Sequence, residues 1–144
     1  MIIDDLQLTG ALQISLNNEI VHQCDNLVVT AGKNWVAGRF KDGSIPDEMS
    51  HMAIGSADTA PAAGNIALAT ELNRIALTTD GGTVSTNTVQ YDASLTSAAA
   101  AYAIKEAGIF NAATGGTMLA RTTFAVINKG TDATVSISWT ISVS

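Results

Sequence analysis

The end of the sequence alternates without a break between apolar and hydroxyl side chains. Val135, Ile137, Trp139, Ile141 and Val143 alternate with Ser136, Ser138, Thr140, Ser142 and Ser144. A period of two places the apolar side chains on one face of an extended strand and the hydroxyls on the other. The pattern predicts a half-buried strand over residues 135–144, tied into a sheet with one covered face.

A second alternating run lies near the N-terminus. Apolar residues occupy even positions at Leu6, Leu8, Leu12, Ile14 and Leu16, and the alternation resumes at Ile20, His22 and Cys24. Asn17-Asn18 separates the two runs, and asparagine tolerates the positive φ angles that a two-residue hairpin turn requires. We expect a β-hairpin over residues 6–24.

The rest of the chain predicts short strands between glycine-containing turns. The strands are expected over residues 27–30, 49–54, 74–78, 88–95, 104–110 and 118–126, helical turns over 33–40, a short helix over 66–72, and an alanine-rich connection at 98–101. This spacing indicates an all-β protein, an antiparallel β-sandwich or a partly closed barrel with one or two short helical turns. We expect one domain over residues 1–144, in which residues 1–50 either join the sandwich or form an arm to a neighbouring subunit.

Charged residues are scarce in this chain. Only 14% of the 144 residues are charged and 47% are apolar, with a net charge of −6, whereas about 25% is the usual charged share. A surface rich in uncharged small residues suits a protein packed against other subunits, and a monomer with a Ser/Thr-rich surface is the alternative. Seven scattered Lys and Arg residues argue against nucleic acid as a partner. Neither a signal peptide nor a membrane span is expected.

The sequence lacks the common catalytic signatures. It contains no nucleophile elbow, Walker loop, dinucleotide-binding glycine motif, zinc-protease motif or paired cysteines. His22 and Cys24 share one face of a predicted strand, but two residues make a weak metal or thiol site, and a partly buried strand face is the simpler interpretation. We expect no enzyme activity, cofactor, metal or small-molecule substrate.

Three charged residues have close apolar neighbours. Glu71, Arg74 and Glu106 lie beside leucines or isoleucines, and an unpaired buried ion would cost several kcal/mol. We hypothesise that Arg74 bridges Glu71 and Glu106. An ordinary exposed ion pair, worth less than about 1 kcal/mol, is the alternative.

The order of short motifs resembles the N-terminal region of phage tail-collar fibre proteins. The motifs are Met52-Ala-Ile-Gly-Ser56, Thr59-Ala-Pro61, Leu68-Ala-Thr-Glu-Leu72 with Arg74, Ile104-Lys-Glu-Ala-Gly-Ile-Phe110, Gly115-Gly-Thr-Met-Leu-Ala-Arg121 and Lys129. They cover about residues 51–144. The resemblance implies a virion protein that assembles as a multimer, with structural roles for Glu71, Arg74, Glu106 and Gly108. Family members usually continue into a long fibre shaft, whereas this sequence stops at Ser144.

These observations lead to an expected function in assembly. We expect a structural component of a tailed bacteriophage virion, a tail, baseplate or collar adaptor, with a capsid decoration protein and a lectin-like host-recognition module as alternatives. Its partners would be copies of itself and other virion proteins, without nucleic acid or membrane. The expected assembly surface comprises Trp35, Ser136, Ser138, Thr140 and Ser142.

Overall fold

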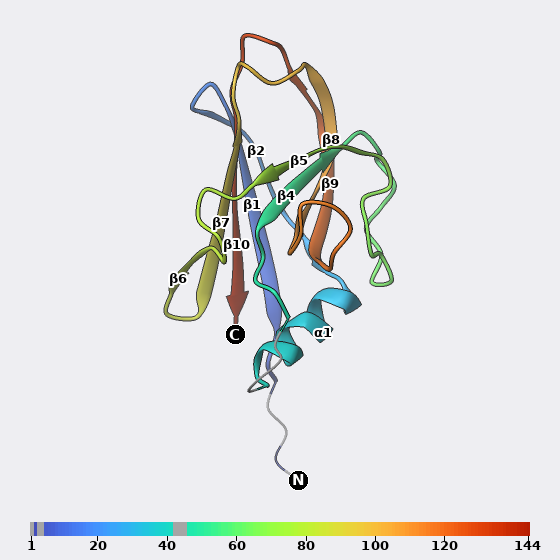
Figure 1. Cartoon of the computed structure of the whole chain (residues 1–144), viewed down its shortest axis with the longest axis vertical. Coiled ribbons are helices and arrows are strands. Elements are labelled where there is room, and N and C mark those ends of the chain that lie inside the picture. Colours follow the sequence, from blue (N-terminus) through green and yellow to red (C-terminus); the bar gives the residue numbers. More distant parts are fainter. Residues whose placement is uncertain (1, 3–4, 42–45) are drawn as a thin grey trace.

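The computed structural model describes residues 2, 5–41 and 46–144. Two five-stranded antiparallel sheets pack together and one short helix lies at their lower end (Figure 1). The elements are β1 (Leu8–Leu16), β2 (Glu19–Asp25), β3 (Leu27–Val28), α1 (Thr30–Arg39), β4 (His51–Gly55), β5 (Glu71–Ala76), β6 (Thr83–Ser85), β7 (Thr88–Leu95), β8 (Tyr102–Phe110), β9 (Met118–Lys129) and β10 (Val135–Val143). The expectation of an all-β sandwich is confirmed.

Sheet A has the strand order β2-β1-β10-β7-β6. Its hairpin β1-β2 turns at Asn17 and Asn18, whose φ angles are +50° and +65°, so the sequence prediction for this turn is confirmed. β1 pairs with β10 along its whole length, from Leu8 opposite Val143 to Leu16 opposite Val135. The predicted hairpin is therefore part of the sandwich.

Sheet B has the strand order β3-β9-β8-β4-β5. The chain passes from sheet A to sheet B between β2 and β3, and Asn26 lies at this crossing. Its side-chain oxygen accepts a hydrogen bond of 2.7 Å from Nε1 of Trp139, which is completely buried. This bond satisfies the indole donor inside the core, as a buried tryptophan requires.

The main core fills the space between the sheets. Sheet A contributes large side chains from β1, β7 and β10, and sheet B contributes them from β4, β8 and β9; they include Leu12, Ile14, Tyr91, Trp139, Met52, Ile54, Ile104, Ile109 and Leu119. Burying a side chain of this size stabilises the fold by about 1.5–3 kcal/mol. The two sheets therefore hold each other together mainly through apolar burial.

Sheet B is also covered on its other face. A second cluster there contains Val29, Ala53, Leu68, Phe110 and Met118. Leu68 belongs to the segment 56–70, which connects β4 to β5, and Val29 directly precedes α1. Consequently β4 and β8 are buried almost continuously, whereas β10 alternates.

Helix α1 begins earlier than the sequence predicted and lies against β9. A Cβ atom on Gly32 would stand 2.0 Å from the carbonyl oxygen of Leu119. Only glycine allows the helix to approach the strand this closely. Within the described residues, no helix has the length and apolar content to cross a membrane.

One sequence expectation about local structure is wrong, and one strand was not expected. Residues 66–72 form no helix; residues 66–70 are irregular and β5 begins at Glu71. Backbone N–H groups of Ala69 and Thr70 donate to the Glu106 carboxylate and so are unavailable for a helical ladder. The short strand β6, which pairs with β7, was not expected.

Candidate assembly surfaces and the buried ion pair

The outer face of sheet A carries the hydroxyl side chains expected from the sequence. Ser136, Ser138, Thr140 and Ser142 are half-buried along β10, which lies between β1 and β7. Ser136 hydrogen-bonds to Ser94 of β7 over 3.1 Å. The strands β1, β10 and β7 carry a single charged residue, Asp92. The middle of this face is therefore polar and nearly uncharged.

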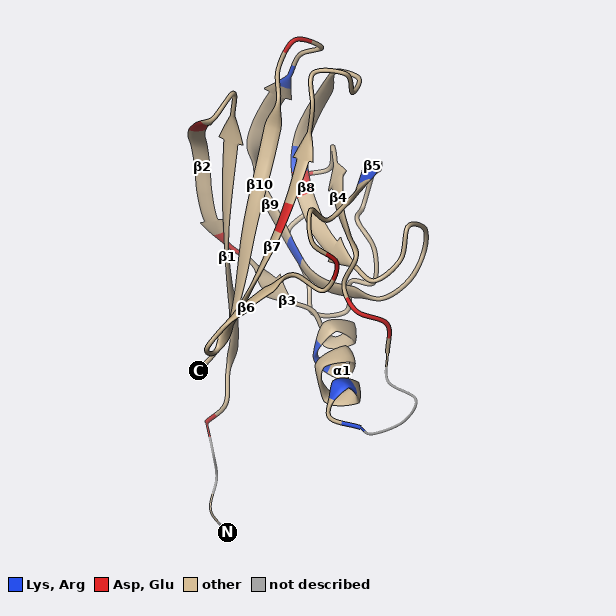
Figure 2. Cartoon of the chain, turned by 60° about the vertical axis from the view of Figure 1, so that its left-hand side comes forward, with Lys and Arg blue, Asp and Glu red and all other residues tan. Residues whose placement is uncertain are grey.

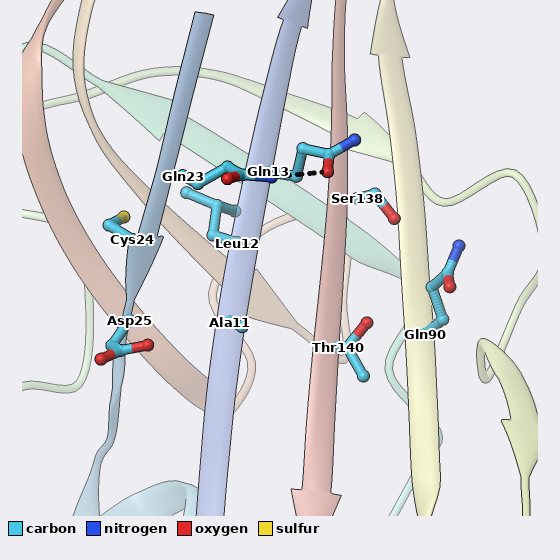
Figure 3. Close-up of a pocket in the computed structure, with 9 residues that line it drawn as sticks. All are labelled: Ala11, Leu12, Gln13, Gln23, Cys24, Asp25, Gln90, Ser138 and Thr140. Carbon is cyan, nitrogen blue, oxygen red and sulfur yellow. Dashed lines mark hydrogen bonds between the residues drawn. The ribbon is translucent and has the colours of Figure 1, made fainter. Parts of the chain in front are cut away.

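A hollow of about 810 Å³ lies on this face (Figure 3). The small side chains of Ala11, Ser138 and Thr140 leave the space open, and longer polar side chains surround it; these are Gln13, Gln23, Asp25 and Gln90. Nε2 of Gln23 donates to Oε1 of Gln13 over 3.0 Å. The hollow therefore offers amide, hydroxyl and carboxylate groups to a partner, and no aromatic ring or cation of the described residues lines it.

Trp35, one of the expected assembly residues, is only partly exposed. Its ring is half-buried against the main core, and its Nε1 donates to the carbonyl of Asp47 over 2.7 Å. The guanidinium of Arg39 lies 5.7 Å from the ring centroid. The neighbouring Phe40, whose side chain is 80% exposed, presents far more apolar surface.

Arg74 pairs with Glu71 but has a different set of further partners from the one hypothesised. Its Nη2 lies 2.7 Å from Oε1 of Glu71, and its Nη1 donates to the carbonyls of Ala112 and Gly115. The guanidinium stacks 3.8 Å from the centroid of Phe110. Arg74 thus links the edge strand β5 to the turn between β8 and β9 through these hydrogen bonds.

Glu106 pairs with Arg121, which corrects the hypothesised bridge from Arg74. Both side chains are buried, and Nη2 of Arg121 lies 2.8 Å from Oε2 of Glu106. Glu106 stands opposite Thr123 in the β8-β9 ladder, so Arg121 is its diagonal neighbour on the same sheet face. A charged residue within the apolar run of β9 was the available sequence signal, and sequence reasoning missed it.

The ion pair also holds the segment 56–70 against sheet B. The Glu106 carboxylate accepts hydrogen bonds from the backbone N–H groups of Ala57, Ala69 and Thr70. Arg121 donates to the carbonyl of Thr59 and to the side chain of Asn65. Because these bonds satisfy most of the polar atoms of the pair, its burial is tolerated. Glu106 and Arg121 are therefore structural residues.

His22 and Cys24 occupy the inner side of β2, as the simpler interpretation expected. The His22 ring lies 5.5 Å from the ring of Phe124, and the Cys24 sulfur lies 3.6 Å from Oγ1 of Thr122. Burial raises the pKa of the Cys24 thiol above its ordinary value, which favours the protonated thiol over the nucleophilic thiolate. Among the described residues, no group of three or more His, Cys, Asp or Glu side chains could hold a metal ion.

Comparison of the chain with protein-family models, with curated proteins and with solved structures gave no significant match.

Proposed function

We propose that the protein is a structural component of a tailed bacteriophage particle, a tail, baseplate or collar adaptor that acts by subunit assembly. The observation that carries the proposal is the outer face of sheet A, whose three middle strands present hydroxyls and amides with only Asp92 charged. Charged residues are depleted at the centre of protein interfaces. This face fits burial against a neighbouring subunit.

The positions that resemble tail-collar fibre proteins give further support. Glu71, Arg74 and Glu106 all form ion pairs on or beside sheet B. At Gly108, a Cβ atom would stand 3.0 Å from Leu68 and 3.3 Å from the carbonyl of Ala120, so glycine lets the segment 56–70 lie close to β8. These residues maintain the fold, and none is assigned a catalytic role.

The direct test is to locate and count the protein in purified particles. In phage particles that carry the gene for this chain, antibody labelling should locate the protein at the tail. Mass spectrometry of the same particles should find far fewer copies of it than of the major capsid protein. A copy number near that of the capsid protein would instead support head decoration. Absence from particles would refute both versions.

A surface test uses the double variant Ser138→Lys with Ser142→Lys. Two cations in the middle of the outer face should prevent incorporation into particles. The matched control is Ala60→Lys with Ala67→Lys, because both residues are exposed on the segment 56–70, which covers sheet B on the side away from sheet A. Normal incorporation of the first variant would show that this face is not the contact.

The hollow on sheet A supports a second candidate function, host-glycan recognition. Its amide, hydroxyl and carboxylate groups match the hydrogen-bonding needs of sugar hydroxyls, although the lining contains no aromatic platform. Glycan-array binding that is lost in Gln13→Ala with Gln90→Ala would support this function. An array without signal for the wild-type protein would exclude it for the glycans displayed.

A further inference from the structure

We propose that a second copy of this chain docks, about a two-fold axis, on the base of the sandwich. The base is the surface formed by α1, Phe40, Leu6 and the end of β10. It lies at the same end as both termini (Figure 1). This surface is separate from the outer face of sheet A.

The base gathers much of the exposed apolar surface of the chain. Phe40 is 80% exposed and Leu6 67%, and Val84 of the neighbouring strand β6, which lines one of the hollows there, is 68% exposed. Two hollows, of about 560 and 290 Å³, adjoin there and share Leu8, Val36, Phe40 and Val143. Exposed apolar surface that gathers in one place marks an interaction site, whereas scattered apolar residues do not.

Phe40 is suited to act as the central anchor. It follows the last residue of α1, and its backbone N–H still donates to the carbonyl of Ala37 over 3.2 Å, so its backbone has a defined position. An exposed aromatic ring beside an apolar hollow is self-complementary. In a two-fold dimer the ring of each copy enters the hollow of the other, because every contact occurs twice. Aromatic anchors of this kind dominate interface energies.

Charges around the base are also self-complementary. Arg74, Lys105 and Arg121 pair with carboxylates, and Lys129 is buried against backbone carbonyls. Among the described residues, this leaves Lys33, Arg39 and Lys41 without a salt bridge. All three belong to α1 or follow it directly (Figure 2).

Acidic residues complete the rim of the same surface. Asp5, Asp47 and Glu48 are exposed; Glu48 lines one hollow together with Phe40, and the Asp47 carbonyl holds Trp35 at the base. Within the described part of the chain, none of them pairs with the three cations. A purely acidic partner would leave these carboxylates opposed by like charge. A second copy, turned by a two-fold axis, can place the cations of each α1 opposite the carboxylates of the other copy.

The test is the solution mass of the full chain, measured by light scattering after size exclusion. At about 100 μM, well above the dissociation constants of ordinary interfaces, the wild-type protein should be a dimer. Phe40→Glu should be a monomer with an unchanged circular dichroism spectrum. The control Ile66→Glu replaces a residue that is 72% exposed on the segment 56–70, and it should remain a dimer.

A charge-reversal experiment checks the geometry. Lys33→Glu with Lys41→Glu should weaken the homodimer at least tenfold, as should Asp47→Lys with Glu48→Lys, and an equimolar mixture of the two variants should recover a heterodimer. A monomeric wild type, a larger cyclic oligomer, or a dimer that persists in Phe40→Glu would overturn the proposal. The proposed particle role is tested separately, because a particle component that is monomeric in solution refutes only the dimer.

Discussion

The two sheets of this protein are built on different principles. Sheet A has one dry face and one wet face, and its strands alternate between buried and half-buried residues. In sheet B, β4 and the adjoining parts of β8 and β9 are buried on both faces, because the segment 56–70 covers the side that faces away from sheet A. A sheet with a solvent-exposed face can bind a partner through that face. The corresponding face of sheet B is instead covered by a segment of the same chain. Sheet A therefore provides the surface available for assembly, and sheet B provides the more rigid part of the fold.

Among the changes considered, breaking the buried ion pair should reduce stability most, because the pair holds the covering segment against sheet B. Arg121→Ala leaves the Glu106 carboxylate buried without its partner, which costs about 3–5 kcal/mol. For a chain of this size we expect the melting temperature to fall by about 10 °C, measured by circular dichroism. Limited proteolysis should begin within the segment 56–70, since its bonds to both residues are disturbed.

The double variant Glu106→Leu with Arg121→Met provides the control for that experiment. Apolar replacement of a buried pair often restores stability, but here it also removes the acceptor for the N–H groups of Ala57, Ala69 and Thr70. We expect a partial recovery of the melting temperature and continued proteolysis of the segment. Full recovery of both would show that the pair is dispensable for covering sheet B.

Arg74→Ala should have an intermediate effect at the edge of the same sheet. The change removes two hydrogen bonds to the β8-β9 turn, the ion pair with Glu71 and the stacking on Phe110. Because the Arg74 side chain is only 9% exposed, we expect a loss of about 2 kcal/mol in denaturant unfolding. Arg74→Lys keeps the charge without the planar fork and should recover less than half of this loss.

Tyr91 provides a test of the dry face of sheet A. Burial raises the pKa of its hydroxyl to about 12 from an ordinary value of 10.0. The folded state therefore keeps a proton that the unfolded state loses, so stability should be unaffected below pH 10 and decrease by about 2 kcal/mol as the pH rises to 12. Tyr91→Phe should have a flatter stability profile over that range, measured by urea unfolding. An equal slope in both proteins would mean that other groups cause the alkaline loss.

The smallest effect on stability is expected on the wet face of sheet A. Ser138→Lys with Ser142→Lys replaces two half-buried hydroxyls that point outward from β10. Surface changes of this kind alter the unfolding free energy by less than about 0.5 kcal/mol. A loss above 2 kcal/mol in the isolated protein would show that this face is packed more tightly than its hydroxyl side chains suggest.

The sequence was informative for sheet A because a sheet with one wet face leaves a period of two in the chain. The alternation at Val135–Val143 and the Asn17-Asn18 turn therefore located β10 and the β1-β2 hairpin correctly. A strand that is buried on both faces carries apolar residues at consecutive positions, so its sequence shows no such alternation. In sheet B the apolar runs gave strand positions but no indication of which side chains share a face.

The ion-pair partner and the segment 56–70 could not be predicted for a related reason. Glu71 and Arg74 are close in sequence, so their pairing was accessible, whereas Glu106 finds Arg121 through the register of β8 and β9. Leu68, Glu71 and Leu72 have the three- and four-residue spacing of one helix face, which led to the wrong prediction of a helix. In the structure Leu68 fills the second cluster, and its neighbours donate their N–H groups to a carboxylate far along the chain.

The pairing of β1 with β10 determines how the sandwich responds to a pulling force. Leu8 and Val143 are direct partners at one end of an antiparallel ladder, so a load applied between these two residues peels the strands apart one hydrogen-bonded pair at a time. Each rupture needs little force, whereas a load along the strands in opposite directions would have to break the whole ladder together. A subunit under tension in a larger assembly would resist best when the load runs along β1 and β10 in opposite directions.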